Sequence, residues 1–396
     1  MTFPNETLPK GRKQKTTSLY DRFVNQGAVM GDNFGLENVL WFAKNKEDAY
    51  EEPTIKRSRS HNYVSKEVIN VRENVGVIEV ANFSKHEFKG PESRKFLDHI
   101  MAGRLPKPGR ISLSPMLTYR GKLYGDLTVA CLDENEFMVF GSGAAQEMHR
   151  RWFESHIDKY NTIYRNRSDD FHGLAIAGPK SRELLQKLCR DNVSNDSLKF
   201  RDSRRMFVGG VPAIVNRISF TGELGYEIYV APHYQIKLYE EINKAGKDLK
   251  IKPFGSRALM SMRLEKNWGA WTLDYRPDFT AKETGLDIFI NWDKDFIGKE
   301  SAKKDQSKNK ITPLIVETNE IDVTNNEAVL KGKDSIGYIT SGGFAHFVNK
   351  SVAFSYINKN EIQNEKGIQV EINGDLFNCS VIKEPLYDPS GQKMRS

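Results

Sequence analysis

The sequence predicts a multi-domain α+β protein whose last part is a small antiparallel β barrel or sandwich. Short apolar strands run into amphipathic helices over most of the chain, and one strand–helix pattern occurs twice. Beyond residue 310, by contrast, the apolar runs are short, β-rich and separated by turns. The chain has 396 residues, of which 38% are hydrophobic and 28% charged, so it can bury a sizeable core as an ordinary globular protein.

A Gly-Pro-x-Ser-Arg sequence marks each copy of the repeated strand–helix pattern. The run VGVIEVANF, from Val75, is typical of a buried strand, and residues 90–102 follow as GPESRKFLDHIMA. The run HGLAIAG leads in the same way to residues 178–190, GPKSRELLQKLCR. Proline suits the first position of a helix, where its missing N–H needs no partner, so we expect each helix to open at the proline. Gly-Pro is a common helix opener, but the recurrence of Ser-Arg in register favours a duplicated α/β unit.

Two hairpins and two further helices are expected around these units. Residues 126–142 and 213–231 each contain two apolar strands joined by a turn. Residues 144–160 predict an amphipathic helix, and another helix is expected from residue 254. The side chains expected to face inward from the helix over 144–160 are Met148, Trp152 and Ile157.

The two ends of the chain differ in character. Residues 1–70 are polar and mixed, and the charged stretch 49–63 predicts a surface loop. Residues 299–310, KESAKKDQSKNK, resemble a linker. The β-rich stretches that follow are ITPLIVE, DSIGYITSGG, KSVAFSYI, GIQVEI and NCSVIKE.

Composition excludes several classes of protein. The net charge of +7 suits either nucleic acid or a small anionic cofactor, but the basic residues are spread out and no nucleic-acid recognition pattern is present, so no nucleic-acid partner is expected. The N-terminus is polar without a leader-like apolar core, and no apolar run could cross a bilayer, so we expect a cytoplasmic protein without membrane contact. The three cysteines are far apart, which argues against disulfides and a zinc site. No GxGxxG follows a strand, and no P-loop, HExxH or GxSxG occurs, so no FAD, NAD or metal site is expected.

Asp126 is an unusual residue for its position. In TYRGKLYGDLTV, residues 118–129, it stands between a glycine turn and an apolar strand, although aspartate is depleted in strands. One explanation is a turn aspartate hydrogen-bonded to its own backbone. The other is a catalytic carboxylate, because an enzyme without the motifs above would work by binding, positioning and a few carboxylates.

Six segments together resemble one family. They are LYDRFVNQGAVMGDNFGLENVLWFA, GKLYGDLTVACL, FTGELGYEIYV, SRALMSMRLEKNWGAW, ETGLDIFINWDKDFIGKESA and the C-terminal SIGYITSGGFAHFVNKSVAFSYI with KEPLYDPSGQKMRS. In this order they resemble the folate-dependent aminomethyltransferases, whose prototype is the T-protein of the glycine cleavage system. They resemble the C-terminal, folate-binding half of dimethylglycine and sarcosine dehydrogenases more closely.

The resemblance implies a cloverleaf fold around a tetrahydrofolate cleft. It divides the chain into a folate-binding domain of two interleaved α/β subdomains, residues 1–300, and a C-terminal β-barrel domain, residues 311–396. It implies tetrahydrofolate as the cofactor and Asp126 as the catalytic residue, stabilising a cationic stage near the reactive folate nitrogens. The residues that it assigns to cofactor binding are Glu227 for the pterin edge, Arg257, Phe220, Leu113 and Gly222. Trp268 and Trp271 are expected to be core rather than site walls.

Three positions depart from the family pattern. Phe220 stands where the signature begins with tyrosine, Leu113 where another folate-contacting tyrosine is common, and Ala258 where aspartate often follows the binding arginine. Leu113 therefore puts the pose of the folate, or the substrate, in doubt.

The resemblance implies a one-carbon transferase that forms 5,10-methylenetetrahydrofolate. The carbon unit would come from a methylated amine of the dimethylglycine or sarcosine type, or from glycine, with a separate FAD oxidoreductase or a lipoyl carrier protein as partner. The alternatives are a demethylase that moves a methyl group from an onium or methoxy substrate, and a non-catalytic folate-binding regulator.

Overall fold

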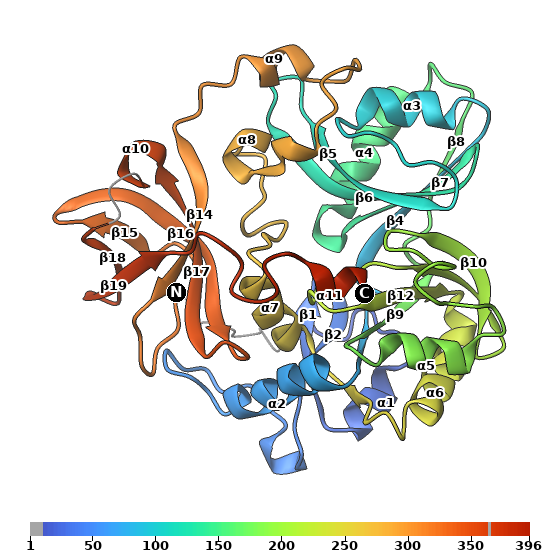
Figure 1. The fold of residues 1–396 in the computed structure, drawn as a ribbon, viewed down its shortest axis with the longest axis horizontal. Coiled ribbons are helices and arrows are strands. Elements are labelled where there is room, and N and C mark those ends of the chain that lie inside the picture. Colours follow the sequence, from blue (N-terminus) through green and yellow to red (C-terminus); the bar gives the residue numbers. More distant parts are fainter. Residues whose placement is uncertain (1–10, 363–365) are drawn as a thin grey trace.

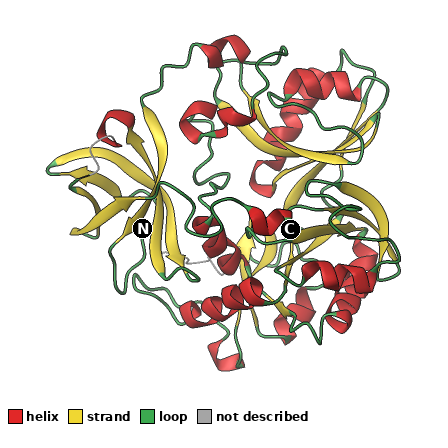
Figure 2. Cartoon of the chain, viewed as in Figure 1, coloured by secondary structure: helices red, strands yellow, loops and turns green. Residues whose placement is uncertain are grey.

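The chain folds into a cloverleaf of three lobes, two built on open sheets and one on a closed barrel (Figure 1). The computed structural model describes residues 11–362 and 366–396. Helices gather on the two open-sheet lobes, whereas the barrel lobe is almost all strand (Figure 2). The first ten residues, on which the expectation of no leader partly depends, lie outside the described residues. Within the described part of the chain, no helix is long and apolar enough to span a bilayer.

The first lobe contains a five-stranded antiparallel sheet in the order β5-β6-β7-β4-β8. Alternate residues of its strands pack beneath two helices in one core, because successive side chains of a strand point to opposite faces. The predicted hairpin is confirmed as β6 and β7. The elements are β4 (Phe83–Lys89), α3 (Ser93–Ile100), β5 (Arg110–Leu117), β6 (Leu123–Asp133), β7 (Glu136–Ser142), η2 (Gly143–Ala145), α4 (Gln146–Ile157) and β8 (Ile163–Asn166).

The second lobe contains a six-stranded sheet in the order β10-β11-β12-β9-β3-β13. Its outer face packs on α5, α6 and α1, and the predicted hairpin over 213–231 is confirmed as β11 and β12. The elements are α1 (Tyr20–Asn25), β3 (Gly76–Glu79), β9 (His172–Ala177), α5 (Ser181–Leu188), β10 (Ser203–Val208), β11 (Val211–Asn216), β12 (Gly225–Val230), η3 (Pro232–Tyr234), α6 (Gln235–Ala245) and β13 (Lys252–Pro253).

The inner faces of the two sheets meet in a shared core. Met138 and Phe140 of β7 belong to the same buried cluster as Ile214 of β11 and Tyr229 of β12. The rings of Phe140 and Tyr229 stack with centroids 4.7 Å apart. The space between the sheets is therefore closed by aromatic contact at its centre, and the site lies along the strands beside that contact.

The third lobe is a closed six-stranded antiparallel barrel, so the barrel is confirmed and the sandwich is wrong. The order β14-β17-β16-β15-β18-β19 returns to β14 through its pairing with β19. The elements are β14 (Asn309–Val316), β15 (Ala328–Lys331), β16 (Asp334–Ala345), β17 (Lys350–Asn358), α10 (Lys359–Ile362), β18 (Ile368–Ile372) and β19 (Asp375–Val381). The sequence did not predict β15, which has only four residues.

The two Gly-Pro-x-Ser-Arg units adopt the same conformation. Gly90 and Gly178 have φ of 143° and 130°, and α3 and α5 both begin at the serine, at Ser93 and Ser181. Each serine N–H donates to the carbonyl of the glycine, at 3.1 and 3.0 Å. The predicted opening at the proline is therefore wrong by two residues, because a turn intervenes. The helices of the two units lie in different open-sheet lobes. The strands predicted to lead into them, β3 and β9, instead pair with each other in the six-stranded sheet, and β4 intervenes between β3 and α3, so the duplicated α/β unit stays a prediction.

Other predictions about the helices needed correction. The buried side chains of α4 are His149 and Phe153, while Met148, Trp152 and Ile157 are only half-buried, so the inward face is shifted by one residue. The sequence missed α2 within the polar first part of the chain. The remaining elements are β1 (Ala28–Asn33), β2 (Leu36–Phe42), η1 (Lys46–Asp48), α2 (Ser60–Glu73), α7 (Ser256–Glu265), α8 (Ala281–Thr284), η4 (Leu286–Phe289), α9 (Lys299–Lys303) and α11 (Gln392–Arg395).

Candidate functional site

Glu227 lies in a narrow, mainly apolar pocket on the inner face of the six-stranded sheet. Among the described residues that line this pocket, Glu227 is the single ionisable one. It alternates along β12 with Tyr226 and Ile228, which point into the opposite core. One carboxylate oxygen, Oε2, accepts a hydrogen bond of 2.8 Å from the Tyr229 hydroxyl. Burial raises the pKa of Glu227 to about 7, while the Tyr229 hydroxyl and the charge of Lys85 act in the opposite direction.

Asp126 lies on the inner face of the five-stranded sheet. It is the fourth residue of β6, in register with Pro115 of β5. Burial raises its pKa to about 7, and a hydrogen bond from its own backbone N–H opposes this rise. Within the described part of the chain its carboxylate has no other hydrogen-bond or ion-pair partner. Asp126 is therefore inside a strand and not in a turn.

The strand registers place the two carboxylates on facing walls. Phe140 is paired with Thr128, and Asp126 precedes Thr128 by two residues on the same face of β6. Glu227 likewise precedes Tyr229 by two residues on the same face of β12. Phe140 and Tyr229 stack on each other, so Glu227 is two residues from one ring of this contact, and Asp126 is two residues from the strand partner of the other ring. Asp126 and Glu227 thus lie on the inner faces of the two sheets that share this contact.

A tight turn closes the pocket beside Glu227. Phe220 and Thr221 line the pocket, and the Phe220 ring stacks on Trp268 with centroids 5.8 Å apart. Trp268 thus supports a wall of the pocket, whereas Trp271 is partly buried and packs against a core cluster near His149. Gly222 follows with φ of 83°, a left-handed conformation that favours glycine. Its predicted role in cofactor binding remains a proposal, but a turn at this position does require a glycine.

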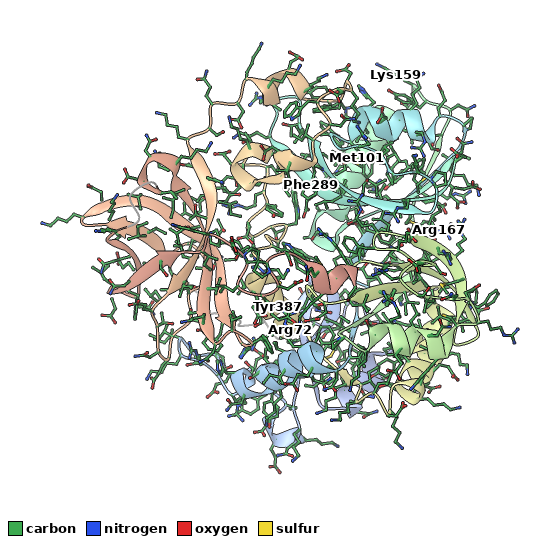
Figure 3. All side chains as sticks on the ribbon, viewed as in Figure 1. Arg72, Met101, Lys159, Arg167, Phe289 and Tyr387 are labelled. Carbon is green, nitrogen blue, oxygen red and sulfur yellow. The ribbon has the colours of Figure 1, made fainter. Side chains whose placement is uncertain are left out.

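A buried ionic cluster holds this turn from behind. Arg72 donates to the carbonyl of Thr221 at 2.8 Å and to Glu223 at 2.9 Å. Its other terminal nitrogen donates to Glu265 at 2.6 Å. The hydroxyl of Tyr387 also donates to Glu223, and the Tyr387 ring lies 3.7 Å from the Arg72 guanidinium carbon (Figure 3). The segment that follows the barrel therefore supports the turn that forms part of the pocket.

We predict that Gly222→Ala destabilises the protein more than the matched change Gly210→Ala. Both glycines are left-handed, at 83° and 80°, which costs an alanine about 1–2 kcal/mol. A Cβ at Gly222 would also lie 2.6 Å from Cγ and Cδ of Lys266, whereas nothing lies within 4 Å of one at Gly210. Lys266 cannot move away easily, because its ammonium is held by the carbonyls of Tyr387 and Asp388. Urea unfolding should therefore show an additional loss of about 1–3 kcal/mol at Gly222, and equal losses would contradict the expected clash.

The last two predicted residues, Leu113 and Arg257, lie in different surroundings from each other. Leu113 is in register with Thr128, on the same face as Asp126, and packs with Trp271 and Tyr275. Leu113 thus lies on the face of the sheet that carries Asp126, and its role in cofactor binding stays a prediction.

Arg257 is not brought to the pocket. Its guanidinium donates to Glu51 and, at 2.8 Å, to the hydroxyl of Ser60. Leu259, two residues further along α7 and on a different side of the helix, lines the pocket instead. These contacts support a structural role for Arg257, and its role in cofactor binding stays a prediction.

The sequence analysis missed two tyrosines near the carboxylates. Tyr229 follows Glu227 by two residues on the same face of β12, and that i, i+2 spacing could have identified it. Tyr275 is half-buried, and its pKa is raised by burial and by the charges of Asp126 and Asp274. No pattern in the sequence relates Tyr275 to Asp126, because they are brought together by the loop between α7 and α8.

The arrangement suits a flat ligand that donates hydrogen bonds from one edge. The walls are apolar and aromatic, and Glu227 keeps its Oε1 without a donor among the described residues. A carboxylate in such surroundings pairs with an edge that carries two N–H donors. The pterin ring of a reduced folate has such an edge, so the chemistry of Glu227 and of the apolar walls matches this group.

Known proteins resemble this chain over nearly its whole length. The family model described as "GCVT N-terminal domain" matches residues 19–294, and the family model described as "Glycine cleavage T-protein C-terminal barrel domain" matches residues 310–388. Dimethylglycine dehydrogenase, mitochondrial, of Mus musculus is 35% identical over 97% of this chain and 45% of its own length. The aminomethyltransferase of Thermotoga sp. (strain RQ2) is 28% identical over 94% of this chain and 98% of its own. The crystal structure of aminomethyltransferase T from Bartonella henselae superposes with a TM-score of 0.82, at 20% identity, over 95% of this chain and 99% of the other.

The fold is therefore that of the aminomethyltransferases, a class of transferase enzymes. The chain belongs to the glycine cleavage T-protein family, and its curated relatives include both aminomethyltransferases and dimethylglycine dehydrogenases. It spans about half the length of the dimethylglycine dehydrogenases that it matches.

Proposed function

We propose that this protein transfers one-carbon units to tetrahydrofolate and forms 5,10-methylenetetrahydrofolate. The donor would be a methylated amine of the dimethylglycine or sarcosine type, or glycine. The observation that carries the proposal is the pair of buried carboxylates on facing sheets, one of them in an apolar pocket that fits a pterin edge. Identity of 35% to a dimethylglycine dehydrogenase favours the methylated amine over glycine as the donor.

The chain's own residues divide the work between binding and charge. Glu227 orients the ligand by accepting hydrogen bonds at Oε1, while Phe220 and the apolar walls keep water away. Tetrahydrofolate, when bound, supplies the amine nitrogens that take up the carbon unit. Asp126 stabilises positive charge from the opposite sheet and accepts a proton as the carbon–nitrogen bonds change. Its pKa of about 7 suits that exchange near neutral pH.

The division of the chain into domains and the partners belong to the same proposal. Residues 1–300 would hold the folate, and residues 311–396 would form the barrel domain that supports the pocket through Tyr387. An FAD oxidoreductase, or alternatively a lipoyl carrier protein, would deliver the carbon unit.

The test mixes the purified protein with tetrahydrofolate and one donor at a time, and identifies the folate products by mass. The donors are formaldehyde, dimethylglycine, sarcosine, glycine betaine and a sulfonium analogue. The proposal would be supported if methylenetetrahydrofolate forms from dimethylglycine only after a flavin oxidase is added. Its formation should also be faster than the reaction of free formaldehyde in a control with heat-inactivated protein. Methyltetrahydrofolate from an onium donor alone would replace it with the demethylase. Bound folate without any product would favour the regulator or a lipoyl-carrier reaction.

A further inference from the structure

Lys85 is a completely buried lysine on β4, immediately behind the pocket. Its Nζ donates to three backbone carbonyls, those of Ala81 at 2.9 Å, Phe83 at 2.7 Å and Ser168 at 3.3 Å. An ammonium has three N–H donors, so three acceptors suit the charged form of the side chain. Among the described residues no carboxylate lies within ion-pair distance of this ammonium. Burying a charge without a direct ion pair is costly, which calls for a functional reason.

The ammonium is connected to Glu227 through the pocket wall. Phe83 and Val80 line the pocket, and Lys85 binds the carbonyls of the segment that carries them. The Nζ lies 5.8 Å from the centroid of the Tyr229 ring, and the Tyr229 hydroxyl is the one that donates to Glu227. Lys85 is thus separated from Glu227 by one side chain.

We propose that Lys85 is a positioning residue for the pterin edge, whose ammonium keeps Glu227 ionised. The inference rests on the proposed function, because it assigns Lys85 to the folate pocket. An ionised Glu227 accepts two hydrogen bonds from the ligand, whereas a protonated one presents a donor to a donor. Lys85 acts through Glu227 and does not touch the ligand.

The charged groups around the pair support this dependence. Burial lowers the pKa of Lys85 to about 7, Asp169, Glu79 and Glu227 act to raise it, and Lys15 acts to lower it. Burial also raises the pKa of Glu79 to about 7, with Gln235 and Lys85 opposing the rise. Burial lowers the pKa of His172 on β9, and the charge of Lys85 lowers it further. Near neutral pH the positive charge on Lys85 and the negative charge on Glu227 therefore stabilise each other.

The test measures binding of 5-formyltetrahydrofolate, a stable reduced folate, by calorimetry between pH 6 and pH 9. Lys85→Met should weaken binding about fivefold at pH 7, because a rise of one unit in the pKa of Glu227, from about 7, lowers its ionised fraction at this pH from about one half to about one tenth. The loss should fall below about threefold at pH 9, where wild-type Lys85 is itself neutral. The matched control is Lys66→Met, because exposed Lys66 lies 5.7 Å from the Tyr63 ring on α2 and should change nothing. A loss that is equal at all pH values, or absent, would overturn the inference.

Glu79→Gln keeps Lys85 in place and therefore tests the inference if Lys85→Met does not fold. Because Glu79 raises the pKa of Lys85, its removal should lower affinity at pH 6.5 and leave affinity at the wild-type value at pH 9, where Lys85 is neutral in both proteins; an equal loss at both pH values would overturn the inference. Where Lys85→Met folds, it should add no further loss in the Glu227→Gln background. Wild-type protein that binds no reduced folate would remove the proposed function itself, whereas normal binding with a pH-independent effect of Lys85→Met would remove only the role of Lys85.

Discussion

Asp126→Asn should slow one-carbon transfer by about 100-fold or more while leaving folate binding nearly intact, as expected for loss of a general acid or base. The amide has the same shape but can neither stabilise positive charge nor accept the proton. Because burial raises the pKa of Asp126 to about 7, the wild-type rate should increase as pH rises through about 7, and the variant should lack that step. The measurement is single-turnover product formation at saturating tetrahydrofolate across pH 5.5–9.

Two controls separate catalysis from folding in this variant. Asp133→Asn makes the same change at the exposed end of β6 and should keep the full rate. Thermal stability should also not fall. The folded protein holds the Asp126 proton up to about pH 7 and the unfolded chain only to about pH 4, so ionisation destabilises the native state as pH rises between these values. The variant avoids that loss and should melt at or above the wild-type temperature at pH 8. A wild-type rate in Asp126→Asn would return this residue to a structural role.

Glu227→Gln should weaken binding of reduced folate by about 30- to 100-fold, with a much smaller effect on the rate at saturation. Hydrogen bonds to a charged group contribute about 1.5–3 kcal/mol, and the neutral amide also turns a donor toward the ligand. Each 1.4 kcal/mol of lost binding free energy lowers affinity tenfold, which gives the expected range of weakening. Calorimetric titration with 5-formyltetrahydrofolate gives the affinity directly.

The matched control for this change is Glu371→Gln, on an exposed position of the barrel strand β18. It makes the same substitution in a strand far from the pocket and should leave affinity unchanged. If Glu227→Gln bound folate as tightly as wild type, the pterin edge would have to be recognised elsewhere, and the pocket assignment would be wrong.

Local patterns predicted the parts of the fold that depend on neighbouring residues. The hairpins β6–β7 and β11–β12 follow from alternation of apolar residues around short turns, and both are observed. The choice between barrel and sandwich depended on the pairing of β14 with β19, which no local pattern contains. Helix α2 was missed because it buries Glu67 and Arg72 along with its valines, so its inward face is not purely apolar. The partners of Arg72 lie at Glu223 and Glu265, far along the chain.

The residues of the candidate site also divide into those that the sequence predicted and those that only the structure could place. The positions of Asp126 and Glu227 followed from the resemblance, but their placement on facing sheets required the registers and the stacking of Phe140 on Tyr229. The role in cofactor binding that the resemblance suggests for Arg257 stays a prediction. A helix turns successive residues by about 100°, and the side of α7 that lines the pocket described above carries Leu259. Lys85 was hidden because a charged residue in a strand usually faces solvent.

The contact between Arg72 and Tyr387 has a consequence for how the protein is made. Translation produces Arg72, Glu223 and Glu265 well before Tyr387, which follows the last barrel strand. Until that residue leaves the ribosome, the turn beside Glu227 lacks one of its buried hydrogen bonds and the aromatic ring that covers Arg72. The open-sheet lobes can form earlier from contacts within each lobe. The pocket is therefore among the last parts of the molecule to mature, and a nascent chain stalled before residue 387 would carry both sheets without a finished ligand site.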